Sequence, residues 1–564
     1  MPIQLITARG EALQNDPARQ PWDVYPRPQT RRESYVNLNG NWEYTVTTGD
    51  FLPQTYTKTI RVPFCPESLL SGVGEHPEDG AYLCYRRSFT LPEGFQKDKV
   101  LLHFGAADQS AEVFLNGIFV GSHLGGYHAF SFDITSLLQP ENTLVVRCRD
   151  DLRDQTQPYG KQTLTRGGMW YTPTSGIWQT VWLESVPETY VQSLSVENRG
   201  YAVTVSVTPA LSGRICVAGL GEFPLTDGKV TIAPEDPHLW SPEDPYLYEF
   251  TLEAGSDRVE SYFAIRALDI REVDGYQRLC LNGKPYFFHG LLDQGYWPDG
   301  LLTPPAPESY ADDILAMKAL GFNMLRKHIK VEPEEFYYQC DKLGMVVFQD
   351  MVNNGDYRFF RDTVLPTVGL QRLNDKKLHA DDATRKEFLR QMELTVQQLK
   401  NHPSICYWTI FNEGWGQFDS DAVCALFRKL DDTRFIDATS GWFRRSNTDV
   451  DSRHVYFKPI RLTGKDKPLV LSEFGGYSYK PEGHVFNTEQ TYGYGKYADQ
   501  ASFAKALEAL YREQVLPAYH KGLCAAVYTQ VSDVEDETNG LLSYDRKVTK
   551  PDPEAMTQIA DLLK

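Results

Sequence analysis

Two apolar stretches of the sequence each end in a glutamate that could take part in catalysis. Residues 406–411 lead into Asn412-Glu413, and residues 468–471 lead, one serine later, into Glu473. Such runs are typical of buried strands. Cleavage of a glycosidic bond with retention requires one carboxyl group that protonates the leaving oxygen and a second that attacks the anomeric carbon. The pair therefore predicts a glycosidase with Glu413 as acid/base and Glu473 as nucleophile, although either glutamate could instead begin the helix after its strand.

The residue types beside the two glutamates suit these roles. A second carboxylate close by helps a general acid to keep its proton near neutral pH, because like charges repel. A nucleophile must stay ionised, which nearby arginine or tyrosine donors favour. Asn412 can bond the 2-hydroxyl of the sugar, and this bond strengthens in the transition state. Trp408 and Trp415, which flank the acid, favour a pocket rimmed by aromatic rings.

Composition and charge exclude several classes of function. The chain has 564 residues and a formal net charge of -18 at pH 7, and its length allows roughly three or four domains. The charge disfavours nucleic acid and anionic membranes as partners. The nine cysteines are scattered without a CxxC pair, which predicts a reducing compartment and no zinc site. Because neither a secretion signal nor a membrane-spanning apolar run is evident, we expect a cytoplasmic protein that acts on a small glycoside.

The pattern of expected strands and helices divides the chain into three parts. Residues 1–186 contain short alternating strands separated by turn residues, which predicts an antiparallel β-sandwich. Residues 187–272 alternate again, over a length that suits an immunoglobulin-like β-sandwich whose last strand is Phe263–Arg266. In residues 273–564, strands alternate with amphipathic helices in about eight units, which predicts a TIM (β/α)8 barrel.

The predicted barrel brings the candidate catalytic residues to one edge. In a TIM barrel the catalytic groups lie at the carboxyl ends of the strands, and Arg326, Asp350, Glu413, Glu473 and Tyr528 all fall at such ends. The predicted strands are residues 286–291, 323–328, 345–350, 406–411, 435–439, 468–473 and 522–529, and the predicted helices are residues 310–321, 334–343, 386–400 and 502–514.

Several motifs, in order along nearly the whole chain, resemble glycoside hydrolase family 2, the family of β-galactosidases, β-glucuronidases and β-mannosidases. The stretches that carry the resemblance are Thr174–Glu184, Phe263–Arg266, Leu281–Pro285 with Gly290, Asn412-Glu413 and Ser472–Gly475. The resemblance implies a jelly-roll sugar-binding domain, an immunoglobulin-like domain and a catalytic TIM barrel. It also implies that Glu413 is the acid/base and that Glu473 becomes a covalent nucleophile, with retention of configuration.

Two departures from the family pattern bear on the site. Many members carry arginine, two small residues and then His-Tyr-Pro, whereas this chain has Arg326-Lys327-His328. Arg326 can still orient the nucleophile, while His328 is equally explained by packing at a strand end. The Mg²⁺-binding pattern of the large β-galactosidases is not recognisable around Glu413, so we expect no metal and no other cofactor.

The sugar is harder to predict than the reaction. The β-glucuronidases of the family grip the substrate carboxylate with an Asn-x-Lys motif shortly before a strand like Gly540–Lys547. This chain has no lysine there, and the acidic loop of residues 533–537 would repel a uronate. We therefore expect an exo-acting enzyme on terminal β-galactosides, with a β-hexuronidase (β-glucuronidase or β-galacturonidase) as the alternative. The cations available to that alternative are Lys327, Lys330, Arg444 and Arg445. An alternative from another class is a carbohydrate-binding protein with an inactive barrel.

Further side chains are candidates for the sugar pocket. Asp293 ends the first barrel strand, where its carboxylate can accept bonds from two hydroxyls, and Asp350 lies at another strand end. Trp442 follows a strand end and could stack on the sugar ring, or pack in the core. Tyr528 lies at the last strand end, and Tyr477 follows the nucleophile closely. Family resemblance also implies a homo-oligomer.

Overall fold

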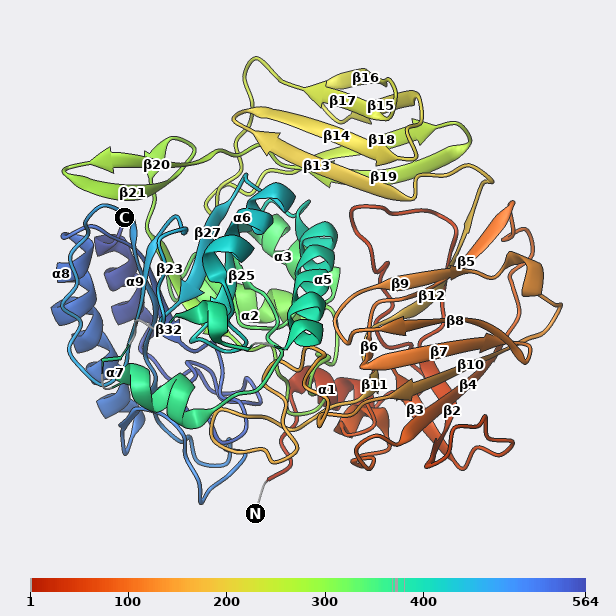
Figure 1. Ribbon diagram of the computed structural model, residues 1–564, viewed down its shortest axis with the longest axis horizontal. Helices are drawn as coiled ribbons and strands as arrows, with labels where there is room; N and C mark the ends of the chain where they lie inside the picture. The colour runs from red at the N-terminus through yellow and green to blue at the C-terminus, as the bar shows by residue number, and fades with distance from the viewer. Residues whose placement is uncertain (1–2, 368, 371–373, 380) are drawn as a thin grey trace.

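Three domains make up the computed structural model, which describes residues 3–367, 369–370, 374–379 and 381–564. Figure 1 shows an N-terminal β-sandwich beside a barrel, with a second, smaller sandwich lying across both. This confirms the predicted architecture of a jelly-roll β-sandwich, an immunoglobulin-like β-sandwich and a TIM barrel. The domain boundaries predicted from the sequence, after residues 186 and 272, remain a proposal. No helix of the described ranges has the length and apolar character needed to cross a membrane.

The N-terminal domain packs two antiparallel sheets face to face. One sheet holds β1 (Tyr35–Asn37), β12 (Val181–Val186), β5 (Lys99–Phe104) and β9 (Phe130–Asp133). The other holds β3 (Lys58–Val62), β2 (Gly40–Thr47), β4 (Tyr82–Phe89), β10 (Asn142–Arg149), β7 (Ser110–Leu115) and β8 (Ile118–Leu124). Short elements beside them are α1 (Ala8–Gln14), β6 (Ala107–Asp108) and β11 (Gly176–Ile177). Alternate residues of β7, Ala111, Val113 and Leu115, are buried between the sheets, because successive side chains of a strand point to opposite faces.

The second domain repeats this layering on a smaller scale. One sheet holds β13 (Ser193–Arg199), β14 (Ala202–Thr208) and β17 (Lys229–Ile232), and the other holds β16 (Gly221–Leu225), β15 (Gly213–Val217), β18 (Tyr248–Ala254) and β19 (Asp257–Phe263). The expected last strand, Phe263–Arg266, is displaced, because β19 ends at Phe263. The chain leaves the sheet there so that the buried Arg266 can donate to the carbonyl oxygen of Ile405, at 2.7 Å, beneath the barrel. A three-stranded sheet of β20 (Leu268–Val273), β21 (Tyr276–Leu281) and β22 (Lys284–Pro285) then leads into the third domain.

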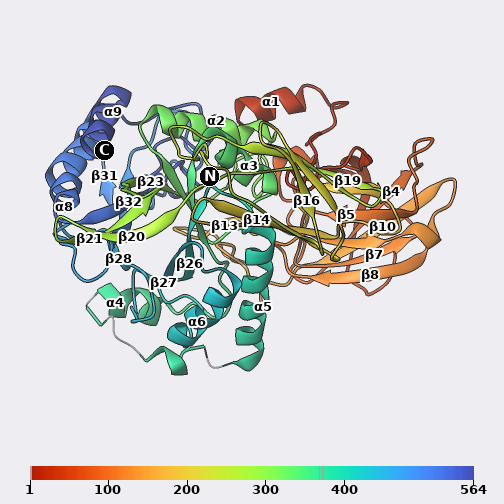
Figure 2. The same ribbon diagram turned by 90° about the horizontal axis from the view of Figure 1, so that it is seen from above.

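The third domain is a sheet of eight parallel strands in the order β27-β26-β25-β24-β23-β32-β29-β28. Their bounds are β23 (Phe288–Asp293), β24 (Met324–Lys327), β25 (Val346–Asp350), β26 (Ile405–Asn412), β27 (Phe435–Ser440), β28 (Asp451–Val455), β29 (Leu469–Gly475) and β32 (Leu523–Thr529). The helices are α2 (Glu308–Ala319), α3 (Glu334–Leu343), α4 (Leu365–Thr367), α5 (Asp382–Leu399), α6 (Ser420–Leu430), α7 (Gln500–Leu510), α8 (Leu516–Tyr519) and α9 (Pro553–Leu562). Figure 2 shows these helices around the strands, with α5 on the side of the N-terminal sandwich. A short pair, β30 (Tyr477–Ser478) and β31 (Gly495–Lys496), lies outside the barrel sheet.

The strand β28 is the one barrel strand that the sequence patterns do not predict. It begins with Asp451-Ser452-Arg453, so it lacks the long apolar run by which the other seven were recognised. It lies at one edge of the sheet and β27 lies at the other. The two edges approach each other, since the hydroxyl oxygens of Ser440 and Ser452 are 3.3 Å apart. The barrel is therefore nearly closed.

Candidate active site

Arg326 links three other strands at the carboxyl edge of the barrel. It lies near the end of β24, and its guanidinium donates to Asp350 Oδ1 on β25 and to Glu473 Oε1 on β29, both at 3.0 Å. A third bond, of 2.8 Å, reaches Asn412 Oδ1 at the end of β26. Burial opposes the charge of Arg326, yet the carboxylates of Asp350 and Glu473 outweigh burial and raise its pKa. The guanidinium therefore stays charged and holds the predicted nucleophile in a fixed position.

Glu473 is buried and kept in its charged form. The hydroxyl of Tyr456 donates to Glu473 Oε2 at 2.6 Å, on the oxygen that Arg326 does not bond. Burial by itself would raise the pKa of Glu473, but the charges of His454 and Arg326 outweigh it, so that the pKa lies below its usual range. An ionised carboxylate held by two donors suits a nucleophile.

The chain turns sharply at Glu413. Its φ of 50° lies in the left-handed region, which is uncommon for residues other than glycine. The turn is held by a bond of 2.9 Å from the Glu413 N–H to the carbonyl oxygen of Ser440. The Glu413 side chain is 16% exposed, against 6% for that of Glu473. The predicted acid is thus more accessible to a leaving group and to water than the predicted nucleophile is.

His454, on β28, lies between the two carboxylates. Its Nδ1 is 2.8 Å from Glu413 Oε1 and 3.5 Å from Glu473 Oε2. Its other ring nitrogen is 3.0 Å from Ser440 Oγ, and the ring of Trp442 packs edge-on against it at 5.4 Å. The imidazole therefore sets the separation and orientation of the two glutamates.

Neither His454 nor Tyr456 is predicted from the sequence, because no strand is expected over β28. The signal that was available is the alternation His454-Val455-Tyr456. Two polar side chains on one face, separated by a buried valine, indicate a strand end that faces a pocket.

One group of side chains in the described ranges could hold a metal ion. It consists of Glu413, His454 and Glu473, whose donor atoms all lie within 4.8 Å of one another. The hydrogen bond between Glu413 and His454 accounts for this proximity without an ion. The absence of a required metal stays a prediction.

Asp350 and His328 lie behind Arg326. The Asp350 carboxylate is 1% exposed and uses one oxygen for Arg326 and the other for His328 Nδ1, at 2.8 Å. Burial lowers the pKa of His328 to about 4, so the imidazole is neutral at pH 7. Burial would raise the pKa of Asp350, but the charge of Arg326 and the bond from His328 lower it. Asp350 therefore orients the arginine.

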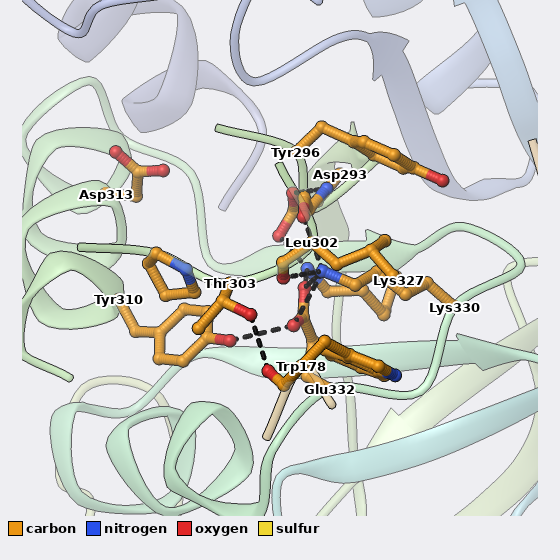
Figure 3. Close-up of polar contacts among 12 residues, drawn as sticks. Trp178, Asp293, Tyr296, Leu302, Thr303, Tyr310, Asp313, Lys327, Lys330 and Glu332 are labelled. Atoms are coloured by element: carbon orange, nitrogen blue, oxygen red, sulfur yellow. Dashed lines mark hydrogen bonds and ion pairs between the residues drawn. The ribbon is translucent and has the colours of Figure 1, made fainter. Parts of the chain in front are cut away.

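Asp293 belongs to a buried cluster of charges between the barrel and the N-terminal domain (Figure 3). Lys327 Nζ bonds Asp293 Oδ2 at 2.6 Å and Glu332 Oε1 at 2.9 Å. Lys330 Nζ also bonds Glu332, at 3.0 Å, and lies 5.5 Å from the ring of Trp178 in the N-terminal domain. Two lysines thus share the carboxylate of Glu332, and Lys327 spans both acids.

The three remaining predicted residues are Tyr528, Tyr477 and Trp442, and each has contacts of its own in the structure. Tyr528 is fully buried, and its hydroxyl accepts a bond of 3.1 Å from the Tyr477 N–H. The half-buried ring of Tyr477 packs against Tyr497 at 5.3 Å. Trp442 is half-buried beside His454, within reach of the pair.

A loop of the N-terminal domain, residues 159–175, reaches the barrel opening. Its Trp170 packs against Trp415, which follows the acid, with ring centres 5.5 Å apart. Lys161 Nζ lies 4.9 Å from the centre of the Trp415 ring. The loop is tied to the barrel where the Tyr159 hydroxyl donates to the carbonyl oxygen of Gly355 at 2.7 Å. No sequence motif identifies these residues, because the contact joins positions far apart in the chain.

The same loop binds the acidic segment of residues 533–537. The carboxylate of Glu535 accepts a bond from the Thr172 N–H at 2.9 Å and pairs with Arg166 at 3.3 Å. Glu537 accepts bonds from the hydroxyl of Tyr171 and from the side chain of Gln530. The N-terminal domain therefore supplies one wall of the site and neutralises part of its acidic charge.

Family models match most of this chain. The model of the glycosyl hydrolases family 2 TIM barrel domain matches residues 272–550, and the model of the glycosyl hydrolase 2 galactose-binding domain-like matches residues 79–174. A third model, of glycosyl hydrolases family 2, matches residues 190–266.

Curated relatives carry two different activities in their names. The chain is 25% identical over 435 residues to a beta-galactosidase of Thermoanaerobacter pseudethanolicus, an alignment that covers 70% of this chain and 54% of the relative. It is 23% identical over 418 residues to a beta-glucuronidase of Bacteroides fragilis, which covers 67% of this chain and 56% of the relative. The chain thus spans about half the length of these relatives.

Solved structures share the fold over nearly the whole chain. A beta-D-glucuronidase of Dictyoglomus thermophilum superposes with a TM-score of 0.72 at 18% identity, covering 95% of this chain and 98% of the other. A beta-galacturonidase of Eisenbergiella tayi superposes with a TM-score of 0.67 at 19% identity, covering 96% and 98%.

Proposed function

Because the chain belongs to glycoside hydrolase family 2, we propose that it is an exo-acting β-glycosidase that releases a terminal sugar with retention of configuration. The observation that carries this proposal is the approach of Glu413 and Glu473, which place oxygen atoms within 4.8 Å of each other. Retaining enzymes hold their carboxyl groups about 5–5.5 Å apart, whereas inverting enzymes leave about 6.5–9.5 Å for a water molecule. The short separation supports a double displacement.

The two glutamates would act in two steps. In the first step the carboxyl proton of Glu413 passes to the glycosidic oxygen, Glu473 bonds the anomeric carbon, and the aglycone leaves as an alcohol. In the second step the carboxylate of Glu413 takes a proton from water, the water oxygen bonds the anomeric carbon, and the bond to Glu473 breaks. Both carboxyl groups return to their starting states, and two inversions leave the product in the β configuration.

Asn412 is positioned to bind the sugar beside the acid. Its Oδ1 is held by Arg326, while its Nδ2 has no hydrogen-bond partner among the described residues. A buried amide nitrogen without a partner costs free energy, which a sugar oxygen would recover. This supports the predicted bond from Asn412 to the 2-hydroxyl.

Two sugars are candidates for the substrate. A β-galactoside is the first, on the ground that the chain lacks the Asn-x-Lys motif. A β-hexuronide is the second, and a specific observation favours it. The acidic loop that would repel a uronate is compensated, since Asp533 pairs with Lys550 at 2.6 Å and Glu535 pairs with Arg166. A buried lysine, Lys161, lies beside Trp415 and has no carboxylate within ion-pair distance in the described part of the chain.

Hydrolysis of nitrophenyl β-glycosides by purified protein tests the proposed reaction. Glu473→Ala is expected to abolish turnover, and added azide is expected to restore release of nitrophenol with formation of an inverted glycosyl azide. Glu482→Ala, an exposed glutamate in the loop after the nucleophile, serves as the matched control. Turnover by Glu473→Ala at the rate of the unaltered enzyme would falsify the assignment, and an α-configured product of the unaltered enzyme would contradict retention.

A cytoplasmic location and a homo-oligomeric state stay parts of this proposal. The location is supported by the nine cysteines, all of which are free thiols, since disulfides are usual in oxidising compartments.

A further inference from the structure

Lys161 is a buried cation for which the described residues provide no ion pair. It is 5% exposed, and within the described ranges its ammonium group makes no ion pair shorter than 4.0 Å and no hydrogen bond. Two aromatic rings lie beside the ammonium group, with the ring centres of Trp415 and Trp170 at 4.9 Å and 5.9 Å from Nζ. Charged side chains are rarely buried unless they are paired, because removal of the charge from water costs several kcal/mol.

The other cations near the site are already paired. Arg326 bonds Asp350 and Glu473, as described above, and Lys550 pairs with Asp533 at 2.6 Å. The four cations proposed from the sequence as binding residues for a uronate also have acid partners. Their acid partners are Asp293 and Glu332 for Lys327, Glu332 for Lys330, Asp451 for Arg444 and Asp375 for Arg445.

The charge of Lys161 acts on residues beside the catalytic pair. Its charge acts on His328, which lies behind the arginine that holds the nucleophile, and on Glu537. Glu537 in turn is close enough to Glu473 for the two charges to interact. Trp415, over which the ammonium lies, follows Glu413 by two positions. The ammonium therefore lies next to residues that adjoin the catalytic pair.

The backbone on both sides of Lys161 is fixed. The carbonyl oxygen of Lys161 accepts a bond of 2.9 Å from the Tyr171 N–H. The side chain of the next residue, Gln162, donates to Asp108 at 3.1 Å and accepts from the Thr174 N–H at 2.6 Å. The ammonium is thus held in advance, so that little conformational entropy is lost when an anion binds it.

We propose that Lys161 binds the carboxylate of a hexuronide substrate and makes the enzyme prefer acidic over neutral sugars. The inference rests on the proposed glycosidase function and assigns recognition of the anion to the N-terminal sandwich instead of to the barrel segment before Gly540. A carboxylate beside Lys161 supplies the missing counter-charge in a site from which water is largely excluded, where charge-assisted hydrogen bonds are strong. The two indole rings lie beside the ammonium, and a uronate carboxylate would add the anionic contact that they do not supply.

A comparison of four substrates tests the role of Lys161. The kcat/KM values for nitrophenyl β-D-glucuronide and β-D-galacturonide are divided by those for the β-D-glucoside and β-D-galactoside. Lys161→Met removes the charge at similar volume and is expected to lower at least one of these ratios about 10- to 150-fold, the loss of a charge-assisted hydrogen bond. Lys161→Arg keeps the charge and is expected to retain a larger part of the ratio. The matched control is Arg153→Gln, which removes an exposed cation of the same domain that pairs with Asp79 and Asp151 and is expected to leave the ratio unchanged.

Calorimetry separates failure of this inference from failure of the glycosidase function. Free D-glucuronate and D-galacturonate are titrated into the unaltered protein and into Lys161→Met, with D-glucose and D-galactose as references, and thermal unfolding confirms that each variant is folded. Weaker binding of a uronate by about tenfold or more in Lys161→Met, with the neutral sugars unaffected, supports the inference even where no turnover is seen. Equal ratios and equal uronate affinities in the two proteins overturn it, and would leave Lys161 as a counter-charge for Glu537 only.

Discussion

The hydroxyl of Tyr456 makes the shortest bond to the proposed nucleophile, so its removal tests how the site keeps Glu473 ionised. The bond is 2.6 Å long and ends on a carboxylate that is 5% exposed. Tyr456→Phe deletes this donor and leaves the ring, which stacks on Tyr494 at 4.1 Å. The remaining donor, Arg326, still bonds the other oxygen. Among the described residues, the variant removes the bond of this hydroxyl to Glu473 and its contact of 2.8 Å with Thr529 Oγ1.

The size of the effect follows from the charge of the acceptor. A hydrogen bond to a charged group contributes about 1.5–3 kcal/mol, and one pKa unit corresponds to about 1.4 kcal/mol. Loss of the bond is thus expected to raise the pKa of Glu473 by about one to two units from its lowered value. The acid limb of kcat/KM, which reports the ionisation of the free enzyme, is expected to move to higher pH by the same amount. The carboxylate is also the leaving group of the second step, so kcat is expected to fall about tenfold to hundredfold.

The assay is a pH profile of kcat and kcat/KM on the best nitrophenyl glycoside, together with rapid mixing to detect a burst of nitrophenol. A burst is expected in Tyr456→Phe, because breakdown of the glycosyl-enzyme becomes limiting. Tyr511→Phe is the matched control, since Tyr511 packs against Phe474 next to the nucleophile and its buried hydroxyl has no partner in the described part of the chain. An unchanged acid limb and a kcat within threefold of the unaltered enzyme would show that the bond does not tune Glu473.

Two predictions concern stability. Among the described residues, Glu332→Gln leaves Lys330 without a carboxylate partner and Lys327 with only Asp293. We therefore expect the free energy of unfolding, measured with denaturant, to fall by about 3–5 kcal/mol. Glu335→Gln, three residues on and bonded only to Gln339 among the described residues, should cost under 1 kcal/mol, and equal losses would contradict the role of the cluster. His289 is buried, and burial lowers its pKa to about 4. In the unfolded chain the pKa of a histidine is about 6.5, so between these values the unfolded state binds a proton that the folded state does not. The free energy of unfolding therefore falls as the pH drops from 6.5 towards 4. Between pH 7 and pH 5, the free energy of unfolding of His289→Leu is expected to fall by about 2 kcal/mol less than that of the unaltered protein. Equal decreases in the two proteins would refute the sign of this linkage.

The fold was accessible to sequence analysis because most of its elements are strongly patterned. The barrel strands are apolar runs that end at polar residues, as before Asp350 and Glu473, and these were predicted within a few positions. The strand β28 was not predicted because its first three residues, Asp451-Ser452-Arg453, are polar. A barrel strand that faces the pocket on one side can carry such residues, since its neighbours supply bonds for them, as Ser472 does for Ser452 at 2.6 Å.

The site was only partly accessible for a related reason. The Asn412-Glu413 pair and Glu473 could be recognised because each follows an apolar run of the sequence. Arg326 was placed correctly at a strand end, but its simultaneous bonds to three strands depend on barrel closure, which no local pattern reports. Residues such as His454 and Lys161 become visible only when β28 and the loop of the N-terminal sandwich are set against the barrel.

The N-terminal sandwich is best understood as part of the catalytic unit and not as an attached module. Its loop carries Lys161 and Trp170 to Trp415, and its Trp178 carbonyl oxygen accepts a bond of 2.5 Å from Thr303 beside the buried charge cluster. Removal of this domain would expose the apolar face of Trp415 and open one wall of the pocket to water. Electrostatic interactions in the pocket would then be screened, since they are strong only where water is excluded. Under the proposed function, the barrel supplies the carboxylates and the jelly roll completes the enclosure in which their charges would act on a sugar.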